Sequence, residues 1–279
     1  MKCLVVGHLV IDRIVRKDKE ELRIGGGAYY SALALSSFCD VKVITSVGKD
    51  FPREWLEELT ERGIAVEVLP SAESTSYELR YLDGNRRKLR LLSRAKPIAS
   101  VNAEGFDLVV LNPVADEIPP ALVSRLAEKH FVATDVQGFI REPIPGPLRL
   151  KPIDGSFLRG VRVLHSDINE FEYVKGLNPS EVEVFLLSDG PNPGTAYLRG
   201  KAYSFEPLRV DVLESTGAGD VFLASFAYFY RRCPFVQALK RAAAFTALFL
   251  ERRDFDIPDE EVGKTAMRVR VSKLISQRL

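Results

Sequence analysis

A run of small residues, TGAG at 216–219, is followed at once by a carboxylate, Asp220, and by an apolar segment with helical spacing. The first backbone N–H groups of a helix have no acceptor within the helix, and they carry partial positive charge. Small residues there let an anion reach the backbone, so Gly217, Ala218 and Gly219 could bind a phosphate. A carboxylate repels a nearby phosphate, and this is tolerable when the acid accepts a proton from a hydroxyl that attacks phosphorus. An equally open interpretation is that Asp220 only caps a tightly packed helix.

A second cluster of glycines, GGG at 25–27, also precedes a segment with helical spacing. A structural turn is enough to explain three glycines on their own. The cluster lacks the G-x-G-x-x-G spacing of dinucleotide-binding folds, and the segment before it alternates like an exposed strand. Both observations count against a Rossmann oxidoreductase.

Two polar segments follow stretches that we expect to be strands. Asn112 ends VVLN, while Gln137 and Arg141 come after FVATD at 131–135. Ligands of open α/β sheets bind at the carboxyl ends of strands, so Asn112 could bond an acceptor hydroxyl and Arg141 could neutralise transferred charge. A turn-forming asparagine and a surface arginine on a proline-rich loop explain the same residues equally well.

The histidines and cysteines do not have the spacing of a metal site, so zinc is not expected. The cysteines are odd in number, scattered and set in apolar segments, which is typical of reduced thiols in a cytoplasmic protein. These residues are His8, His130, His165, Cys3, Cys39 and Cys233.

Charge is nearly balanced, with 39 basic and 38 acidic residues in 279. The balance gives no electrostatic reason to expect nucleic acid or an anionic membrane as the main partner. The basic runs Arg86-Arg87-Lys88 and Arg231-Arg232 are short, and we expect them to lie on solvated faces. No uninterrupted apolar stretch reaches the roughly 20 residues of a membrane span.

Strand-like and helix-like segments alternate along much of the chain, which predicts an α/β fold with a mostly parallel sheet covered by helices on both faces. The expected strands are 2–7, 41–47, 106–112, 131–135 and 161–165, and the expected helices are 28–38, 52–62, 120–129, 169–175, 218–231, 235–251 and from 258 to near the C-terminus.

Two segments, 9–24 and 76–92, instead alternate apolar and charged residues with a period of two. The second contains Asp83-Gly84-Asn85 between its alternating runs, a strong hairpin signal. We expect these segments to form a small β-sheet that stands off the main one, as a lid over a site, a dimer-forming flap or both. The absence of repeats and linkers predicts a single domain, 1–279, that carries this insertion.

Taken in order, the glycine pair near the N-terminus and TGAGD before a buried helix resemble the two signatures of the ribokinase-type carbohydrate kinases, the PfkB family. The resemblance extends over essentially the whole chain and includes the lid strands between the first core strand and GGG. It implies a ribokinase-like fold and phosphoryl transfer to an alcohol group.

The resemblance also implies roles for the matching residues. Asp220 corresponds to the catalytic base, and Gly217, Ala218 and Gly219 correspond to the anion hole for the transferring γ-phosphoryl group. Asp12, Gly25 and Gly26 match acceptor-binding positions. With the strand-end residues, the expected acceptor site comprises Asp12, Gly25, Gly26, Tyr30, Asn112, Gln137 and Arg141.

The segment HSDINE at 165–170 is similar to the family's Asn-x-x-Glu motif, whose glutamate helps to organise Mg²⁺ and phosphate. Glu170 would hold the metal through water, and Asp167 replaces the usual asparagine, a charge that fits a nearby cation. The residues expected to contact the nucleotide are Asp167, Glu170, Ser188, Gly190, Gly194, Thr216, Ala243 and Thr246.

Departures from the family pattern bear on the acceptor. Tyr30 stands where ribokinase has asparagine, and it follows Tyr29. This disfavours ribose and favours an acceptor that can lie against an aromatic ring. Glu214 replaces the usual aspartate two residues before Thr216, a mild change.

We therefore expect an ATP-dependent, Mg²⁺-requiring cytoplasmic kinase of a small polyol. The chain is most similar to an archaeal branch of the family that includes myo-inositol kinase. A hexose kinase, a nucleoside kinase and a non-catalytic nucleotide- or sugar-binding protein are the alternatives. The expected partners are the polyol and ATP, without nucleic acid or membrane, in a monomer or in a homodimer that forms through the lid.

Overall fold

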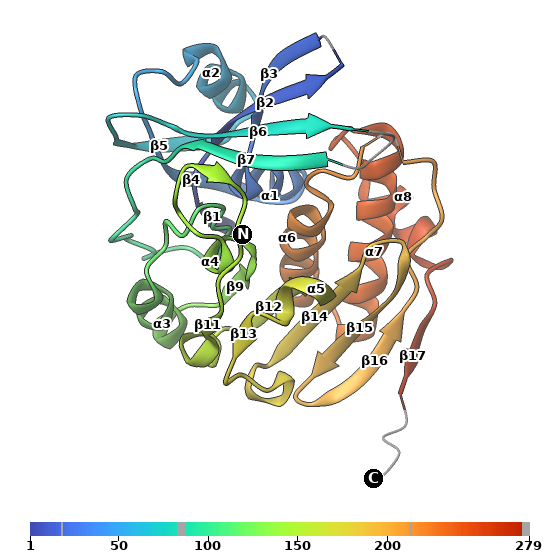
Figure 1. The fold of residues 1–279 in the computed structure, drawn as a ribbon. Coiled ribbons are helices and arrows are strands. Elements are labelled where there is room, and N and C mark those ends of the chain that lie inside the picture. The colour runs from blue at the N-terminus through green and yellow to red at the C-terminus, as the bar shows by residue number, and fades with distance from the viewer. Residues whose placement is uncertain (18, 83–86, 213, 275–279) are drawn as a thin grey trace.

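A computed structural model describes residues 1–17, 19–82, 87–212 and 214–274 (Figure 1). The main sheet has the order β17-β16-β15-β14-β12-β9-β8-β1-β4-β5, and its strands from β14 to β5 are parallel. The chain starts at β1 and builds outward on both sides, so the strand order reverses between β1 and β8. The strands are β1 Lys2–Val6, β4 Asp40–Val47, β5 Ala65–Pro70, β8 Leu108–Leu111, β9 Val132–Asp135, β12 Val163–Asp167, β14 Val184–Asp189, β15 Asn192–Leu198, β16 Lys201–Phe205 and β17 Val271–Lys273.

Both faces of the central strands of this sheet are buried, which explains why these strands are almost continuously apolar. In β1, Cys3 and Val5 enter the hydrophobic cluster on one face, while Leu4 and Val6 enter the cluster on the other face. Alternation of side chains along a strand requires this division.

Helices cover the sheet on both sides, as predicted, so the expected fold class is confirmed (Figure 1). The α6 and α7 helices pack side by side in the cluster that also contains α1, and α3 packs in the opposite cluster. Among the described residues, no helix is both long and apolar enough to cross a membrane. The helices are α1 Gly27–Ser36, α2 Arg53–Glu61, α3 Pro120–Lys129, α4 Gln137–Ile140, α5 Ile168–Phe171, α6 Ala218–Tyr230, α7 Phe235–Arg252 and α8 Asp259–Ala266.

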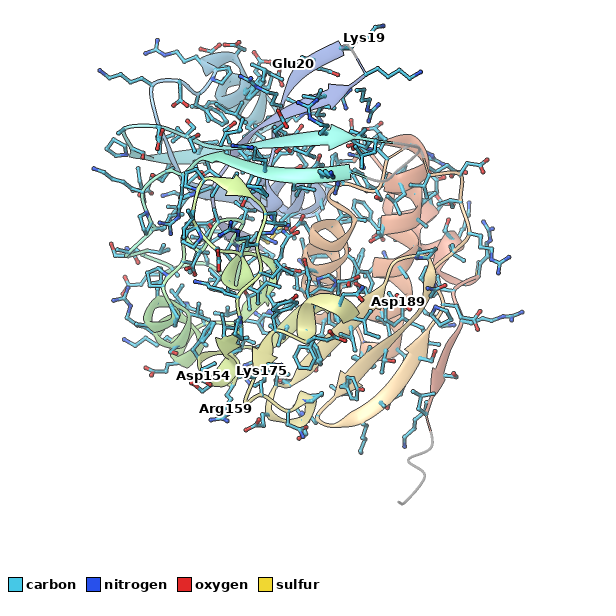
Figure 2. The ribbon with its side chains drawn as sticks, in the orientation of Figure 1. Lys19, Glu20, Asp154, Arg159, Lys175 and Asp189 are labelled. Atoms are coloured by element: carbon cyan, nitrogen blue, oxygen red, sulfur yellow. A yellow bond between two sulfur atoms is a disulfide. The ribbon has the colours of Figure 1, made fainter. Side chains whose placement is uncertain are left out.

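A smaller sheet, which we call the lid sheet, has the order β10-β7-β6-β2-β3 and lies over one end of the main sheet (Figure 1). It contains the two segments with period-two alternation, and the proline-rich loop adds one short strand. Lys19 and Glu20 lie at its tip, far from Asp154, Arg159 and Lys175 (Figure 2). The predicted turn Asp83-Gly84-Asn85 lies outside the described residues, as 83–86 are not among them. The lid strands are β2 Val10–Arg16, β3 Lys19–Gly25, β6 Thr75–Tyr81, β7 Arg87–Ser93 and β10 Gly146–Pro147.

Two helix predictions were too long. The segment 169–175 forms only the short α5 and then β13, Val174–Lys175, which pairs with β11, Ile153–Asp154. Beyond 258, α8 ends at Ala266 and the chain returns as β17, paired with β16. In both places, pairing with another strand outweighs a weak local helical pattern, and at β13 Val174 is also buried.

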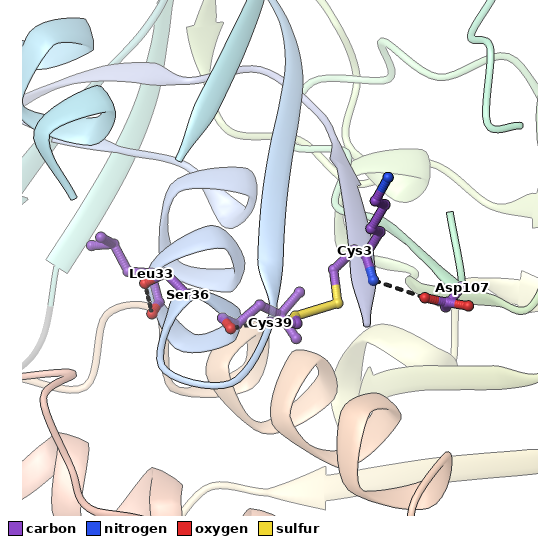
Figure 3. The surroundings of a disulfide bond; sticks show 7 residues. Cys3, Leu33, Ser36, Cys39 and Asp107 are labelled. Carbon is purple, nitrogen blue, oxygen red and sulfur yellow. Dashed lines mark hydrogen bonds between the residues drawn. A yellow bond between two sulfur atoms is a disulfide. The ribbon is translucent and has the colours of Figure 1, made fainter. Parts of the chain in front are cut away.

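Cys3 and Cys39 form a disulfide, which corrects the prediction that the cysteines are reduced (Figure 3). Cys3 lies in β1, and Cys39 precedes β4, the parallel neighbour of β1. Their Cα atoms are 6.4 Å apart although 36 positions separate them in the sequence. Their distance in the sequence had suggested separate thiols, but the pairing of β1 with β4 brings the two cysteines together.

Candidate active site

Asp220 lies in the first turn of α6, where α6 meets the start of α1 and the end of β8. Its Oδ1 accepts a hydrogen bond from Asn112 Nδ2 at 3.1 Å. A Cβ atom at Gly27 would lie only 2.5 Å from the same Oδ1, so a side chain at position 27 would displace the carboxylate. The N-cap of α6 is Gly217, with no side-chain cap. The capping interpretation of Asp220 thus has no hydrogen bond in support.

The turn before α6 brings backbone close to the site. Gly217 has φ 84°, a left-handed conformation, and a Cβ there would lie 2.3 Å from the ring of Tyr30. Arg253 holds the turn from behind by donating to the carbonyls of Glu214 at 3.0 Å and Thr216 at 2.9 Å. This turn presents the positive end of α6 toward the cavity in front of it.

His165 lies directly behind Gly219, with its Cε1 3.0 Å from where a Cβ of that glycine would be. The ring is buried, and it bonds Asp135 Oδ2 at 2.5 Å through Nδ1 and Ser188 Oγ at 3.1 Å through Nε2. Burial lowers the pKa of His165, but the hydrogen bond and charge of Asp135 outweigh it, so the pKa is raised. The ring lies next to the expected anion hole.

Several carboxyl groups converge here. Burial, with the neighbouring Asp135, raises the pKa of Asp220 to about 7 and that of Glu170 to about 7. His165 and Arg141 oppose the shift in both groups. A carboxyl group that titrates near neutrality can accept a proton in one step and release it in the next.

The larger of two cavities at this place has a volume of about 400 Å³. Its polar lining includes Asp135, His165 and the turn before α6. Its apolar lining comes from side chains of β16, α7 and the loop after β16: Phe205, Pro207, Leu208, Ala243, Ala247 and Leu250.

Most residues expected to contact the nucleotide line this larger cavity, namely Asp167, Glu170, Ser188, Gly190, Thr216, Ala243 and Thr246. The Oγ1 of Thr246 is buried without a hydrogen-bond partner among the described residues. Gly194 is not among the described residues that line the cavity, because it lies in β15 against the ring of Phe205.

The smaller cavity, of about 90 Å³, lies between the lid sheet and the start of α1. Of the expected acceptor site, Asp12, Gly26, Tyr30, Gln137 and Arg141 line this cavity. Asn112 and Gly25 lie just behind its wall, against Asp220 and Asp12 respectively. Asn112 Oδ1 is buried and has no partner within the described part of the chain.

Asp12, in β2, is the carboxyl group that the lid sheet contributes to the smaller cavity. Burial raises its pKa to about 7, while Arg87 and Arg141 pull the pKa down. Arg141 is buried, and it donates to Gln137 Oε1 at 2.5 Å and to the carbonyl of Val114 at 3.3 Å. It is therefore not a surface arginine on a proline-rich loop.

The two cavities meet at one place. The residues that line both are Arg87, Gln137, Thr216, Gly217 and Asp220. A group bound in one cavity can thus contact a group bound in the other beside Asp220.

The sequence did not reveal the roles of three residues near Asp220. Arg87 was expected on a solvated face, but it lines both cavities. His165 was set aside as a zinc ligand for lack of a ligand-spaced partner, whereas it bonds Asp135 across 30 positions. Gly27 was noted only as part of the GGG cluster. The only local signal was that His165 and Asp135 each end a predicted strand, which places them at one edge of a parallel sheet.

Mg²⁺ is usually bound by one or two carboxylates, waters and phosphates, and the carboxylates that line the larger cavity suit it. Asp167 and Glu170 are two of them. Within the described residues there is no cluster of three side-chain ligands that could hold a metal ion.

The chain is similar to known kinases. A pyrophosphate-dependent kinase in the ribokinase family, solved as a sulfate complex, has a TM-score of 0.80 at 25% identity, over 93% of this chain and 99% of that one. The ribokinase of Thermotoga maritima has a TM-score of 0.74 at 15% identity, over 95% and 99%. A cytidine kinase of Thermococcus kodakarensis is 22% identical over 82% of this chain and 88% of its own. No model of a protein family matches the chain. The predicted resemblance to ribokinase-family kinases is confirmed, and it supports a carbohydrate kinase.

Proposed function

From its likeness to the ribokinase-family kinases, we propose that this protein transfers the γ-phosphoryl group of ATP to a hydroxyl group of a small polyol, best matched by myo-inositol. The observation that carries the proposal is the position of Asp220. Its carboxyl group lies where a large cavity with a phosphate-binding turn meets a small polar cavity. Direct transfer between two bound molecules requires this arrangement.

Asp220 acts as the base. The acceptor hydroxyl becomes acidic as its oxygen bonds to phosphorus, and Asp220 accepts the proton at that stage. Asn112 orients the carboxylate through its 3.1 Å hydrogen bond. The α6 N-terminus stabilises the charge on the transferring phosphoryl group. Mg²⁺, when bound with the donor near Glu170 and Asp167, supplies charge neutralisation at the phosphates.

The apolar side chains in the lining of the larger cavity favour ATP over pyrophosphate. Pyrophosphate has no apolar surface to bury against such side chains, whereas a purine base buries a large apolar face. The unpartnered Thr246 Oγ1 among these described side chains offers a polar contact for such a base. Solved relatives include both a pyrophosphate-dependent kinase bound to a pyrophosphate analogue and myo-inositol, and an Arabidopsis thaliana ribokinase with ribose and ATP.

A compact acceptor is favoured because the smaller cavity is about 90 Å³, less than a quarter of the 400 Å³ of the larger one. Its polar groups, Asp12, Gln137 and Arg141, can bond several hydroxyls at once, and the ring of Tyr30 forms one wall. A cyclitol presents both a ring of hydroxyls and apolar C–H faces.

Two lid leucines suggest which hydroxyl reacts. Leu79 and Leu89 pair across β6 and β7, and both line the smaller cavity. In a related pyrophosphate-dependent myo-inositol-1 kinase, changing an asparagine and a serine to leucine gives a myo-inositol-3 kinase. On the premise that Leu79 and Leu89 stand where those two leucines stand, we infer phosphorylation at the 3-position of myo-inositol.

The first experiment is a panel of donors and acceptors. Product formation is followed with ATP, GTP, ADP or pyrophosphate against myo-inositol, ribose, hexoses and cytidine. We expect ATP with myo-inositol to have the highest kcat/KM. A higher kcat/KM with pyrophosphate would contradict the donor, a higher value with cytidine would contradict the acceptor, and no turnover with any pair would support a non-catalytic binding protein.

A further inference from the structure

Arg87 is the first residue of β7, and the lid sheet carries its side chain down to the junction of the two cavities. Its Nη1 donates to Thr216 Oγ1, and it lies 3.4 Å from the hydroxyl of Tyr81. Thr216 directly precedes Gly217, so the guanidinium group touches the phosphate-binding turn itself.

Other lid residues converge on the same segment. Glu214 Oε1 accepts hydrogen bonds from Tyr81 Oη at 3.2 Å and from Thr216 Oγ1 at 2.9 Å. Glu214 Oε2 pairs with Arg23 at 3.4 Å. Three lid strands, β3, β6 and β7, thus contact the turn before α6. The position of Arg87 is set by the same contacts that bring the lid down on the site.

The charge of Arg87 acts at this junction. It lowers the pKa of Asp12 in the smaller cavity, and it lines the larger cavity with Gly217 and Asp220. A phosphoryl group in transfer between the cavities must pass beside Asp220 and the turn before α6, and Arg87 lines both cavities at that place. An arginine fork matches the geometry of phosphoryl oxygens.

We propose that Arg87 is a catalytic residue that donates hydrogen bonds to the non-bridging oxygens of the transferring phosphoryl group, so that closure of the lid completes the site. This rests on the proposed function. The acceptor oxygen forms a bond to the γ-phosphorus, the bond from that phosphorus to the bridging oxygen breaks, and its electron pair leaves with ADP. The hydroxyl proton passes to Asp220. Arg87 neither gains nor loses a proton, and it stabilises charge that is largest in the transition state.

The alternative is that Arg87 only latches the lid to Thr216. Replacement by alanine and by lysine separates the two roles. For a direct contact, R87A lowers kcat by about 10²-fold, with a much smaller change in the KM of the acceptor. R87K restores little, because an ammonium group cannot form the fork. Added guanidinium ion at low millimolar concentration should partly restore the rate of R87A, which a structural latch would not permit.

Arg90 provides the matched control. It lies on the same strand, exposed, opposite Glu78 in β6, and it is not among the described residues that line either cavity. R90A should have kinetics close to wild type. Thermal unfolding of R87A and R90A should be similar, and if R87A fails to fold, R87K carries the comparison.

Binding provides the sharpest test. Calorimetry of R87A should find the affinity for the β,γ-imido analogue of ATP lowered roughly tenfold more than the affinity for ADP, because only the analogue carries the third phosphate. Equal losses for both nucleotides, or kcat of R87A equal to that of R90A, would overturn the assignment. If wild type uses pyrophosphate, the same comparison is made with imidodiphosphate and phosphate. If wild type transfers phosphate from neither donor, the proposed function fails, and this assignment fails with it.

Discussion

At the scale of single residues, the site depends on a carboxyl group kept in an unfavourable place. Asp220 receives a hydrogen bond from Asn112, but it also lies near Asp135 and Glu170, and its pKa is raised to about 7 mainly by burial. The positive end of α6, His165 and Arg141 offset part of this cost. A residue that only capped the helix would gain nothing from such surroundings.

This arrangement predicts a pH-dependent cost in stability. The pKa of Asp220 is about 7 in the folded protein against a model value of 3.8, so the fold favours the neutral form. The contribution of the neutral Asp220 carboxyl group to stability is fully present below pH 3.8 and is lost as the pH rises through 7. The amide of an asparagine at this position would be neutral throughout. D220N should therefore match wild type near pH 4 and be more stable at pH 8 by at least roughly 1 kcal/mol.

Urea unfolding at the two pH values measures the difference. The control is D40N, a change at an exposed aspartate, which should follow wild type at both. If D220N loses stability relative to wild type between pH 4 and pH 8, the raised pKa of Asp220 is wrong.

At the scale of elements, the lid sheet determines what the smaller cavity can hold. Its inner face contributes Asp12 from β2, Leu79 from β6 and Leu89 from β7. Leu79 and Leu89 have no hydrogen-bonding groups, so the hydroxyls of a bound cyclitol must point toward other residues of the cavity. Side chains of the lid sheet therefore select the orientation of the acceptor in the cavity and do more than cover it.

We predict that L79N/L89S alters the hydroxyl that is phosphorylated, from the 3-position toward the 1-position of myo-inositol, while the chain still folds. The 1- and 3-phosphates are mirror images, so chiral separation of the product is the measurement. Leu22, which is 50% exposed on the lid, serves as the control: L22S should yield the wild-type product. An unchanged single enantiomer from L79N/L89S would contradict this role of the leucine pair.

At the scale of the whole molecule, local sequence patterns predicted the central strands and most helices because apolar periodicity is a property of neighbouring residues. TGAGD likewise identified the turn before α6 as a candidate phosphate site, since its small residues and acid are contiguous. Local patterns could not predict contacts between distant segments: Arg87 bonds Thr216 across 129 positions, and His165 bonds Asp135 across 30. The disulfide of Cys3 and Cys39 depends equally on the order of strands in the sheet.

Direct transfer between the two cavities requires Asp220 as the base, and single-turnover transfer from γ-labelled ATP to myo-inositol tests this role most directly. Wild type should form labelled inositol phosphate, and D220N should bind ATP but transfer at least about 10²-fold more slowly. Transfer by D220N at a rate near that of wild type would contradict the central claim.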